Sequence, residues 1–79
     1  MKTLIIGSGL QGRVVGYDIL KYVKDAEVIY ADIDAENLAI TKEFIKDPRA
    51  SFVEFNVLDV EETAALMRKS DSIVVCLPH

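Results

Sequence analysis

The sequence predicts an α/β fold in which parallel strands alternate with helices. Short runs of branched apolar residues recur along the chain, as buried parallel strands do. Between these runs lie stretches whose apolar residues recur at helical spacing. All four glycines of the chain fall within ten residues, at positions 7, 9, 12 and 16, directly after the first run. Repeated strand–helix–strand units of this kind imply a parallel sheet with right-handed crossovers.

The first such unit occupies the N-terminal part of the chain. Lys2–Ile6 is predicted as a strand because it is short, apolar and ended by glycine. Leu10–Val23 is predicted as a helix, and Val28–Ala31 as the second strand, which ends at Asp32. The apolar positions of the helix are Leu10, Val14, Val15, Ile19, Leu20, Tyr22 and Val23.

A second helix is predicted over Ala35–Lys46, with Asp34 as its N-cap. Asp47-Pro48 ends it, because proline disfavours the helical conformation in the residue before it. We expect four residues on its inner side: Leu38, Thr41, Phe44 and Ile45.

The rest of the chain repeats the pattern. Phe52–Phe55 alternates as a third strand, and Asp59 caps a third helix that runs to about Lys69. Glu62 lies three residues after Asp59, in a capping-box position. Ile73–Leu77 is the fourth strand.

The predicted sheet has the strand order 3-2-1-4. In that order the first two helices cover one face of the sheet and the third covers the other. The 79 residues form one domain at most. We interpret them as the N-terminal half of a three-layer domain, with further strands and a catalytic or substrate domain expected beyond His79.

Composition excludes several function classes. Nine basic against thirteen acidic residues give a net charge of −4, which argues against nucleic-acid and anionic-membrane partners. No apolar run approaches the roughly 18 residues that cross a bilayer. One histidine and one cysteine cannot build a metal site or a disulfide. Cys76 is interpreted as a small buried hydrophobic residue, and a cytoplasmic location is expected.

The glycine cluster contains the motif Gly7-Ser8-Gly9-Leu10-Gln11-Gly12 between a predicted strand and a predicted helix. Gly7 would allow the tight turn, Gly9 would let a pyrophosphate approach the backbone, and Gly12 would let the helix lie close to the strand. The N–H groups of Leu10 and Gln11 lack helical partners and would form an anion site. This context predicts a dinucleotide-binding Rossmann-type domain rather than an ordinary strand-to-helix turn.

Asp32 supplies the acidic part of the same fingerprint. It lies 20 residues after Gly12 at the end of the second strand, where its carboxylate would accept the adenosine-ribose hydroxyls. A 2′-phosphate would be repelled there, and no arginine occurs within residues 31–35. The sequence therefore favours NAD over NADP. Asp34 is better explained as a helix cap. Val57, Leu58 and Asp59 follow the third strand, where the adenine would rest.

These motifs resemble the saccharopine dehydrogenase superfamily, especially lysine 6-dehydrogenases. The resemblance covers all 79 residues. It is carried by the glycine motif, Ala31-Asp32-Ile33-Asp34, Asn56-Val57-Leu58-Asp59, Leu66-Met67-Arg68-Lys69 and Asp71-Ser72-Ile73-Val74-Val75-Cys76-Leu77-Pro78.

The resemblance implies that the glycine loop, Asp32 and Ile33 bind NAD(P), and that Leu77 and Pro78 lie beside the cofactor. It implies an oxidoreductase that transfers hydride at a CH–NH or CH–NH₂ centre of a small amino-acid-like substrate, as part of a homo-oligomer. The catalytic residues would lie beyond His79 and are unknown, so residues 1–79 alone are expected to be inactive.

Two other classes share parts of the pattern. NAD-sensing regulatory domains of potassium channels and transporters also begin with a strand and this motif. Their third helix usually carries a longer, glycine-containing segment, whereas residues 59–71 here are glycine-free. Methyltransferases that use S-adenosylmethionine usually have an acidic residue just before the loop and helices ahead of the first strand, and neither is present.

Overall fold

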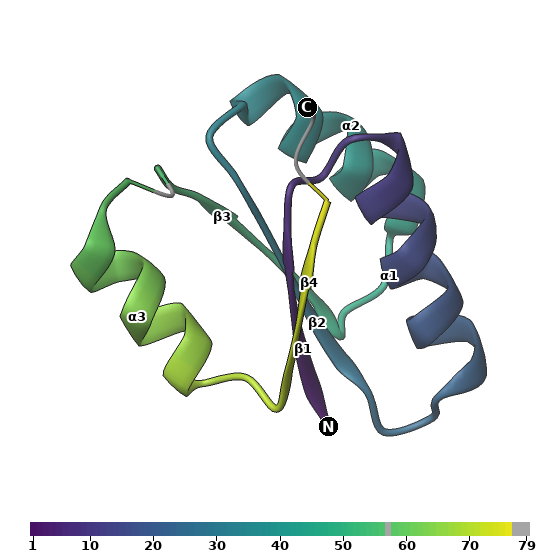
Figure 1. Cartoon of the computed structure of the whole chain (residues 1–79). Coiled ribbons are helices and arrows are strands. Elements are labelled where there is room, and N and C mark those ends of the chain that lie inside the picture. Colours follow the sequence, from purple (N-terminus) through teal and green to yellow (C-terminus); the bar gives the residue numbers. More distant parts are fainter. Residues whose placement is uncertain (57, 77–79) are drawn as a thin grey trace.

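The computed structural model describes residues 1–56 and 58–76, in which strands and helices alternate (Figure 1). The elements are β1 (Lys2–Ile6), α1 (Leu10–Tyr22), β2 (Glu27–Asp32), α2 (Ala35–Ile45), β3 (Ala50–Glu54), α3 (Val60–Arg68) and β4 (Ser72–Val75). The predicted elements are therefore confirmed, with ends that shift by one or two residues. Leu77, predicted to end the fourth strand, lies outside the described residues. No helix in the described part of the chain is long and apolar enough to span a membrane.

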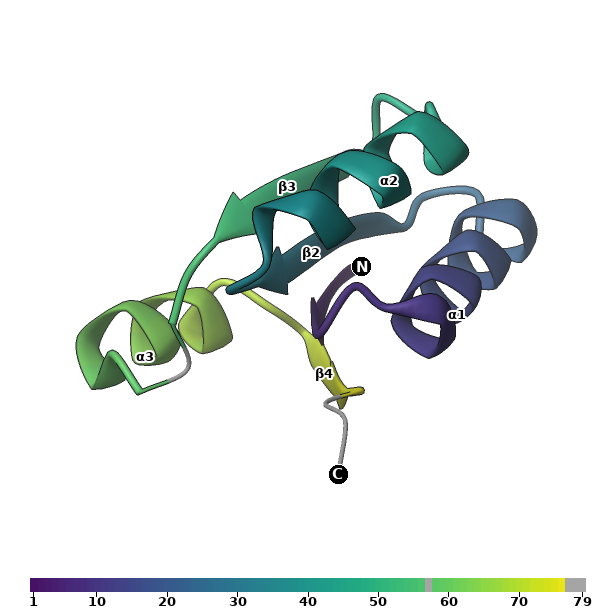
Figure 2. The ribbon, with the colours of Figure 1, turned by 90° about the horizontal axis from the view of Figure 1, so that it is seen from above.

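The strands form one parallel sheet in the order β3-β2-β1-β4, as predicted. Helices α1 and α2 cover one face and α3 covers the other, so the domain has three layers (Figures 1 and 2). Because side chains alternate along a strand, β1 contributes to both cores. Leu4 and Ile6 join Leu66 of α3, whereas Ile5 joins Leu20 of α1 and Leu38 of α2.

Helix α1 packs against the sheet through its glycines. Gly12, Gly16 and Leu20 are its buried residues. A Cβ at Gly16 would overlap the hydroxyl group of Tyr30 and lie 2.9 Å from Cδ1 of Ile5. The sheet is therefore too close to α1 to admit a side chain at position 16.

This close packing leaves several apolar side chains of α1 on the outside. The apolar spacing identified the helix, and the position of Gly12 and Gly16 one turn apart indicated the face that packs closely. The exposed apolar residues are Leu10, Val14, Tyr17 and Tyr22.

Helix α2 faces the sheet with Leu38 and Thr41, which are buried, and Ile45, which is partly buried. The prediction that Phe44 lies on the inner side is wrong, because this side chain is 54% exposed. Its ring lies on the flank of α2 that faces α1, with its centroid 5.5 Å from that of Tyr17. Phe44 thus contacts the neighbouring helix instead of the sheet.

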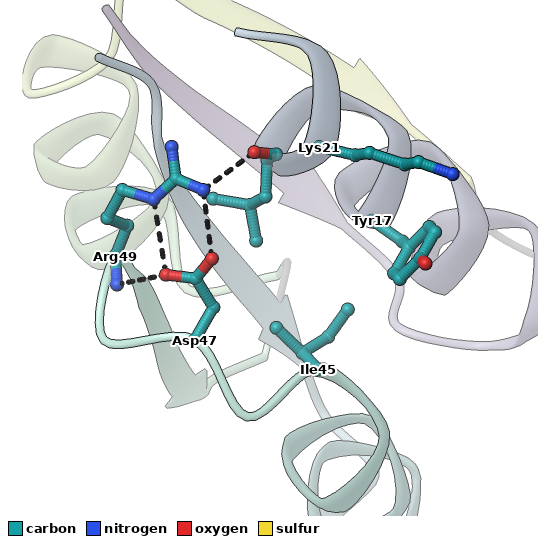
Figure 3. Close-up of a pocket in the computed structure, with 6 residues that line it drawn as sticks. Tyr17, Lys21, Ile45, Asp47 and Arg49 are labelled. Atoms are coloured by element: carbon teal, nitrogen blue, oxygen red, sulfur yellow. Dashed lines mark hydrogen bonds and ion pairs between the residues drawn. The ribbon is translucent and has the colours of Figure 1, made fainter. Parts of the chain in front are cut away.

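Arg49 joins the C-terminal end of α1 to the start of β3. Its guanidinium donates hydrogen bonds to the carbonyl oxygens of Leu20, Val23 and Lys24, at 2.6, 3.1 and 2.9 Å. It also pairs with the Asp47 carboxylate at 2.9 Å (Figure 3). These carbonyls have no helical partners, so Arg49 acts as a C-terminal cap supplied from elsewhere in the chain.

We expect Gly16→Ala to destabilise the domain although alanine favours helices. Overpacking of this kind costs about 1–3 kcal/mol, against a gain in helix propensity of roughly 1 kcal/mol. Chemical denaturation should therefore show a lower free energy of unfolding. The matched control is Gly9→Ala, because a Cβ at Gly9 has no neighbour within 4 Å. Equal stabilities for the two variants would contradict the close packing of α1.

Candidate dinucleotide-binding site

The glycine loop lies at the carboxyl edge of the sheet, between β1 and α1 (Figure 1). Gly7 has a φ of 99°, a conformation that L side chains rarely adopt, and its N–H donates to the Ala31 carbonyl at 2.8 Å. A Cβ at Gly12 would overlap the carbonyl oxygen of Gly7 and lie 3.1 Å from Cγ2 of Ile5. The turn and the close approach of helix to strand both require glycine, as the sequence indicated.

Gly9 is the N-cap of α1 and gives that helix no side-chain cap. The other two described helices are capped, α2 by Asp34, which accepts from Glu36 N–H at 2.9 Å, and α3 by Asp59. The first N–H groups of α1 therefore remain available to a ligand, and the helix dipole favours an anion there. Since nothing lies within 4 Å of a Cβ built at Gly9, a phosphate has open space to approach the backbone.

Asp32 ends β2 and lies directly against this loop. Its Oδ2 accepts hydrogen bonds from the N–H of Ser8 at 2.8 Å and from the Ser8 hydroxyl at 2.9 Å. Its Oδ1 accepts from the N–H of Asp34 at 2.9 Å. The side chain of Asn37 is a further hydrogen-bond donor to this carboxylate.

The environment of Asp32 favours its ionised form. Burial raises the pKa of this carboxyl, but the hydrogen bonds from Asp34 and Ser8 outweigh burial, and the pKa lies below its ordinary value. At neutral pH Asp32 is therefore an anion at the end of β2. That negative charge favours a hydrogen bond from a ribose hydroxyl and repels the 2′-phosphate of NADP.

Sequence reasoning missed a polar connection from α2 to the loop. The Thr41 hydroxyl, which is fully buried, donates to the Ser8 carbonyl oxygen at 2.9 Å and accepts from Nε of Arg13 at 3.1 Å. The sequence placed Thr41 on the inner side of its helix but gave it no role. A buried hydroxyl needs a hydrogen-bond partner. This requirement could have predicted from the sequence that Thr41 bonds to a neighbouring element.

The remaining predicted site residues flank the same edge. Ile33 and Leu58 are exposed, at 63% and 81%. Asp59 caps α3 through Oδ1, which accepts from the N–H of Glu62 at 3.1 Å. The N–H of Phe55 donates to the Asp32 carbonyl at 2.9 Å and joins this segment to the end of β2. Val57, Leu77 and Pro78 lie outside the described residues.

Two shallow hollows lie at the opposite edge of the sheet. The first, of about 250 Å³, lies beside the Arg49–Asp47 pair and is lined by Tyr17, Leu20, Lys21, Ile45, Asp47 and Arg49 (Figure 3). The second, of about 440 Å³, lies between the end of α2 and the start of β3. Neither contains a predicted site residue. Ligands of open parallel sheets bind at the carboxyl ends of the strands, so the glycine loop remains the candidate.

Residues 3–79 match the family model described as the saccharopine dehydrogenase NADP binding domain. The chain belongs to this family. The resemblance noted in the sequence is thereby confirmed. As a saccharopine dehydrogenase NADP binding domain, the chain is a dinucleotide-binding Rossmann domain of the oxidoreductase type.

Among solved structures, this domain is similar to the dTDP-glucose 4,6-dehydratase of Bacillus anthracis strain Ames, solved in complex with NAD. The TM-score is 0.81 and the sequence identity 20%, over 100% of this chain and 27% of that chain. The likeness shows the fold, and the domain spans about a quarter of the dehydratase chain. A comparison with curated protein sequences found no significant match.

We expect Gly9→Val to abolish most dinucleotide affinity while leaving the fold intact. The branched side chain would occupy the space through which the pyrophosphate approaches, and apart from adjacent residues of the chain no protein atom lies within 4 Å of its Cβ. Titration calorimetry should show a Kd raised by more than about tenfold, with an unchanged unfolding midpoint. Gly9→Ala is the graded control, with a smaller effect. Unchanged affinity in Gly9→Val would remove this loop from the site.

We expect Asp32 to contribute stability that depends on pH. Because its folded-state pKa is lowered, the contribution is complete above the ordinary value of about 3.9 and is lost as the pH falls through the folded-state value. Asp32→Asn should lower the free energy of unfolding by on the order of 1.5–3 kcal/mol at pH 7. Denaturation of both proteins from pH 7 to pH 2 should show this difference shrinking below pH 4. A difference in the free energy of unfolding that stays constant down to pH 2 would contradict the stabilising role of the ionised Asp32 carboxylate.

Proposed function

We propose that this domain binds NAD as the cofactor domain of a cytoplasmic dehydrogenase that acts on CH–NH or CH–NH₂ bonds. The observation that carries the proposal is the arrangement at the carboxyl edge, where the uncapped N-terminus of α1 lies beside an ionised Asp32. Membership of the family supports a dinucleotide as the ligand. An amino-acid-like substrate rests on the resemblance to lysine 6-dehydrogenases.

In this proposal the residues of the chain bind and orient the cofactor. The pyrophosphate lies over Gly9, where the N–H groups of Leu10 and Gln11 donate to it. The carboxylate of Asp32, at the end of β2, accepts one adenosine-ribose hydroxyl. Ile33 and Leu58 offer exposed apolar surface for the adenine, next to the Asp59 carboxylate. Contacts of Val57, Leu77 and Pro78 with the cofactor remain predictions. When bound, NAD supplies the hydride acceptor.

The choice between NAD and NADP depends on two opposing charges. The Asp32 carboxylate opposes a 2′-phosphate and favours NAD. NADP is the second candidate, because the family is described by NADP and Arg13 lies in the same hydrogen-bonded network. The Asp32 carboxylate bonds directly to Ser8, whereas the Arg13 guanidinium reaches Ser8 only through the Thr41 hydroxyl.

We also propose that further strands and a substrate domain complete this protein. Ile73 and Val75 of β4 are 41% and 61% exposed, on a strand without charge or proline. Natural edge strands usually carry charged residues or proline, which prevent pairing with another strand. Because β4 has neither, it has the character of an interior strand. The added part would supply the catalytic residues and the contacts of a homo-oligomer.

We expect the protein to bind NADH more tightly than NADPH, and Asp32→Asn to narrow that ratio by roughly tenfold, since charge repulsion of the 2′-phosphate disappears. Calorimetric titration with both dinucleotides measures it. Any distortion of the loop affects the binding of both dinucleotides alike. The ratio of the two dissociation constants within each variant is therefore independent of it. Arg13→Met is the control, because it should lower the affinity for NADPH more than the affinity for NADH if Arg13 contacts the 2′-phosphate.

A wild type that prefers NADPH would contradict the role given to Asp32 in cofactor choice. Tight NADH binding, without NAD-dependent oxidation of any amino acid by the protein with its proposed substrate domain, would favour the regulatory alternative, an NAD-sensing domain. Absence of binding to either dinucleotide would contradict the proposed function as a whole.

A further inference from the structure

Thr41 is a buried polar residue at the centre of a network that joins α2, α1 and the glycine loop. It has no exposed surface. Its hydroxyl is hydrogen-bonded on both sides, as donor to the Ser8 carbonyl oxygen at 2.9 Å and as acceptor from Nε of Arg13 at 3.1 Å. A valine would fill the same volume without these bonds, so packing alone does not require threonine here.

The partner of Thr41 is the residue on which the loop conformation depends. Ser8 is fully buried and is held by every polar group that it has. Its N–H and its hydroxyl donate to Asp32, and its carbonyl accepts from Thr41. β2 therefore fixes one side of Ser8 and α2 fixes the other.

The bond from Thr41 acts directly on the peptide group that carries Gly9. A trans peptide is planar, and its C=O and N–H point in opposite directions. When Thr41 holds the Ser8 carbonyl on the α2 side, the Gly9 N–H points away from α2. Gly9 is also the N-cap of α1 and borders the open space of the candidate site. The orientation of this peptide thus sets what the loop offers to a phosphate.

We propose that Thr41 is a positioning residue for dinucleotide binding: its hydroxyl fixes the Ser8–Gly9 peptide in the orientation that receives the pyrophosphate. The inference rests on the proposed function, because it assigns Thr41 a role in that same site. Arg13 supports the arrangement, since its bond to Thr41 ties the first turns of α1 to α2. Thr41 itself does not contact the ligand.

The test compares three variants of the protein, Thr41→Val, Thr41→Ser and Thr3→Val. Thr41→Val removes the hydroxyl at constant volume, and Thr41→Ser keeps it. Thr3→Val is the matched control, because Thr3 is 1% exposed and its hydroxyl also makes a 2.9 Å hydrogen bond, to Ser72. Thr3 lies near the start of β1, at the opposite end of that strand from the loop.

We expect NADH titration to show a Kd raised about tenfold in Thr41→Val and unchanged in Thr41→Ser and Thr3→Val, since each hydrogen bond lost is worth roughly threefold to tenfold in affinity. Both valine variants should lose stability to a similar extent, so a loss of affinity confined to position 41 separates positioning from general damage. The amide resonance of Gly9 should shift in Thr41→Val and stay in place in Thr3→Val.

Unchanged NADH affinity in Thr41→Val, or equal losses in the two valine variants, would overturn the positioning role while leaving the proposed function intact. A wild type that binds neither NADH nor NADPH would overturn both. If Thr41→Val unfolds, Thr41→Ala and Thr41→Ser make the same comparison, because they both lack the methyl group and differ in the hydroxyl. Equal affinities for those two variants would also overturn the role.

Discussion

The close approach of α1 to β1 and β2 is the constraint on which the rest of the site depends. At Gly12 and Gly16 no Cβ fits between helix and sheet, and the hydroxyl group of Tyr30 occupies the space beneath Gly16. That hydroxyl donates to the carbonyl of Arg13 at 3.0 Å, so β2 bonds to the second turn of the helix as well as packing against it. At the other end of α1, Arg49 caps its last carbonyls. A helix held at both ends points its N-terminus at a fixed place.

The polar groups around Ser8 then convert that fixed helix into a defined loop. One carboxylate oxygen of Asp32 holds Ser8, and the other accepts from the N–H of Asp34 at the carboxyl end of β2. The same residue therefore has a structural and a proposed ligand-binding role. Loss of its charge would affect the loop and the cofactor together, which is why ratios of affinities are more informative than single affinities for this residue. Thr41 has only the structural connection, so its substitution isolates the effect of loop geometry.

The two faces of the sheet are completed to different extents. The α1–α2 face has a continuous core that includes Ile5, Val28 and Tyr30, and partly buried Val74 and Cys76 pack against it. The α3 face leaves Ile73 and Val75 of β4 exposed. Cys76 thus takes the place of a small hydrophobic residue in this core, as the apolar run around it indicates. The difference between the faces agrees with a domain in which β4 is an interior strand.

Much of this architecture is determined by the sequence alone. Periodicity and glycine spacing suffice for the strand order, the layers and the turn at Gly7, because each depends on local backbone preferences and on the handedness of crossovers. Asp34 and Asp59 are recognisable as caps for the same local reason.

Only the tertiary structure decided which residues face each other. The inner face of α1 combines Gly12 and Gly16 with Leu20, and the depth to which each apolar residue of the helix is buried depends on how closely the helix approaches the sheet. Phe44 turned to Tyr17 because α2 has two neighbours, the sheet and α1, and helical spacing does not distinguish them. The bonds of Thr41 to Ser8 and Arg13 join residues 33 and 28 positions apart, and no local pattern encodes such a contact. The sequence determined where the chain turns and which residues cap its helices, whereas packing determined which side chains hold the loop.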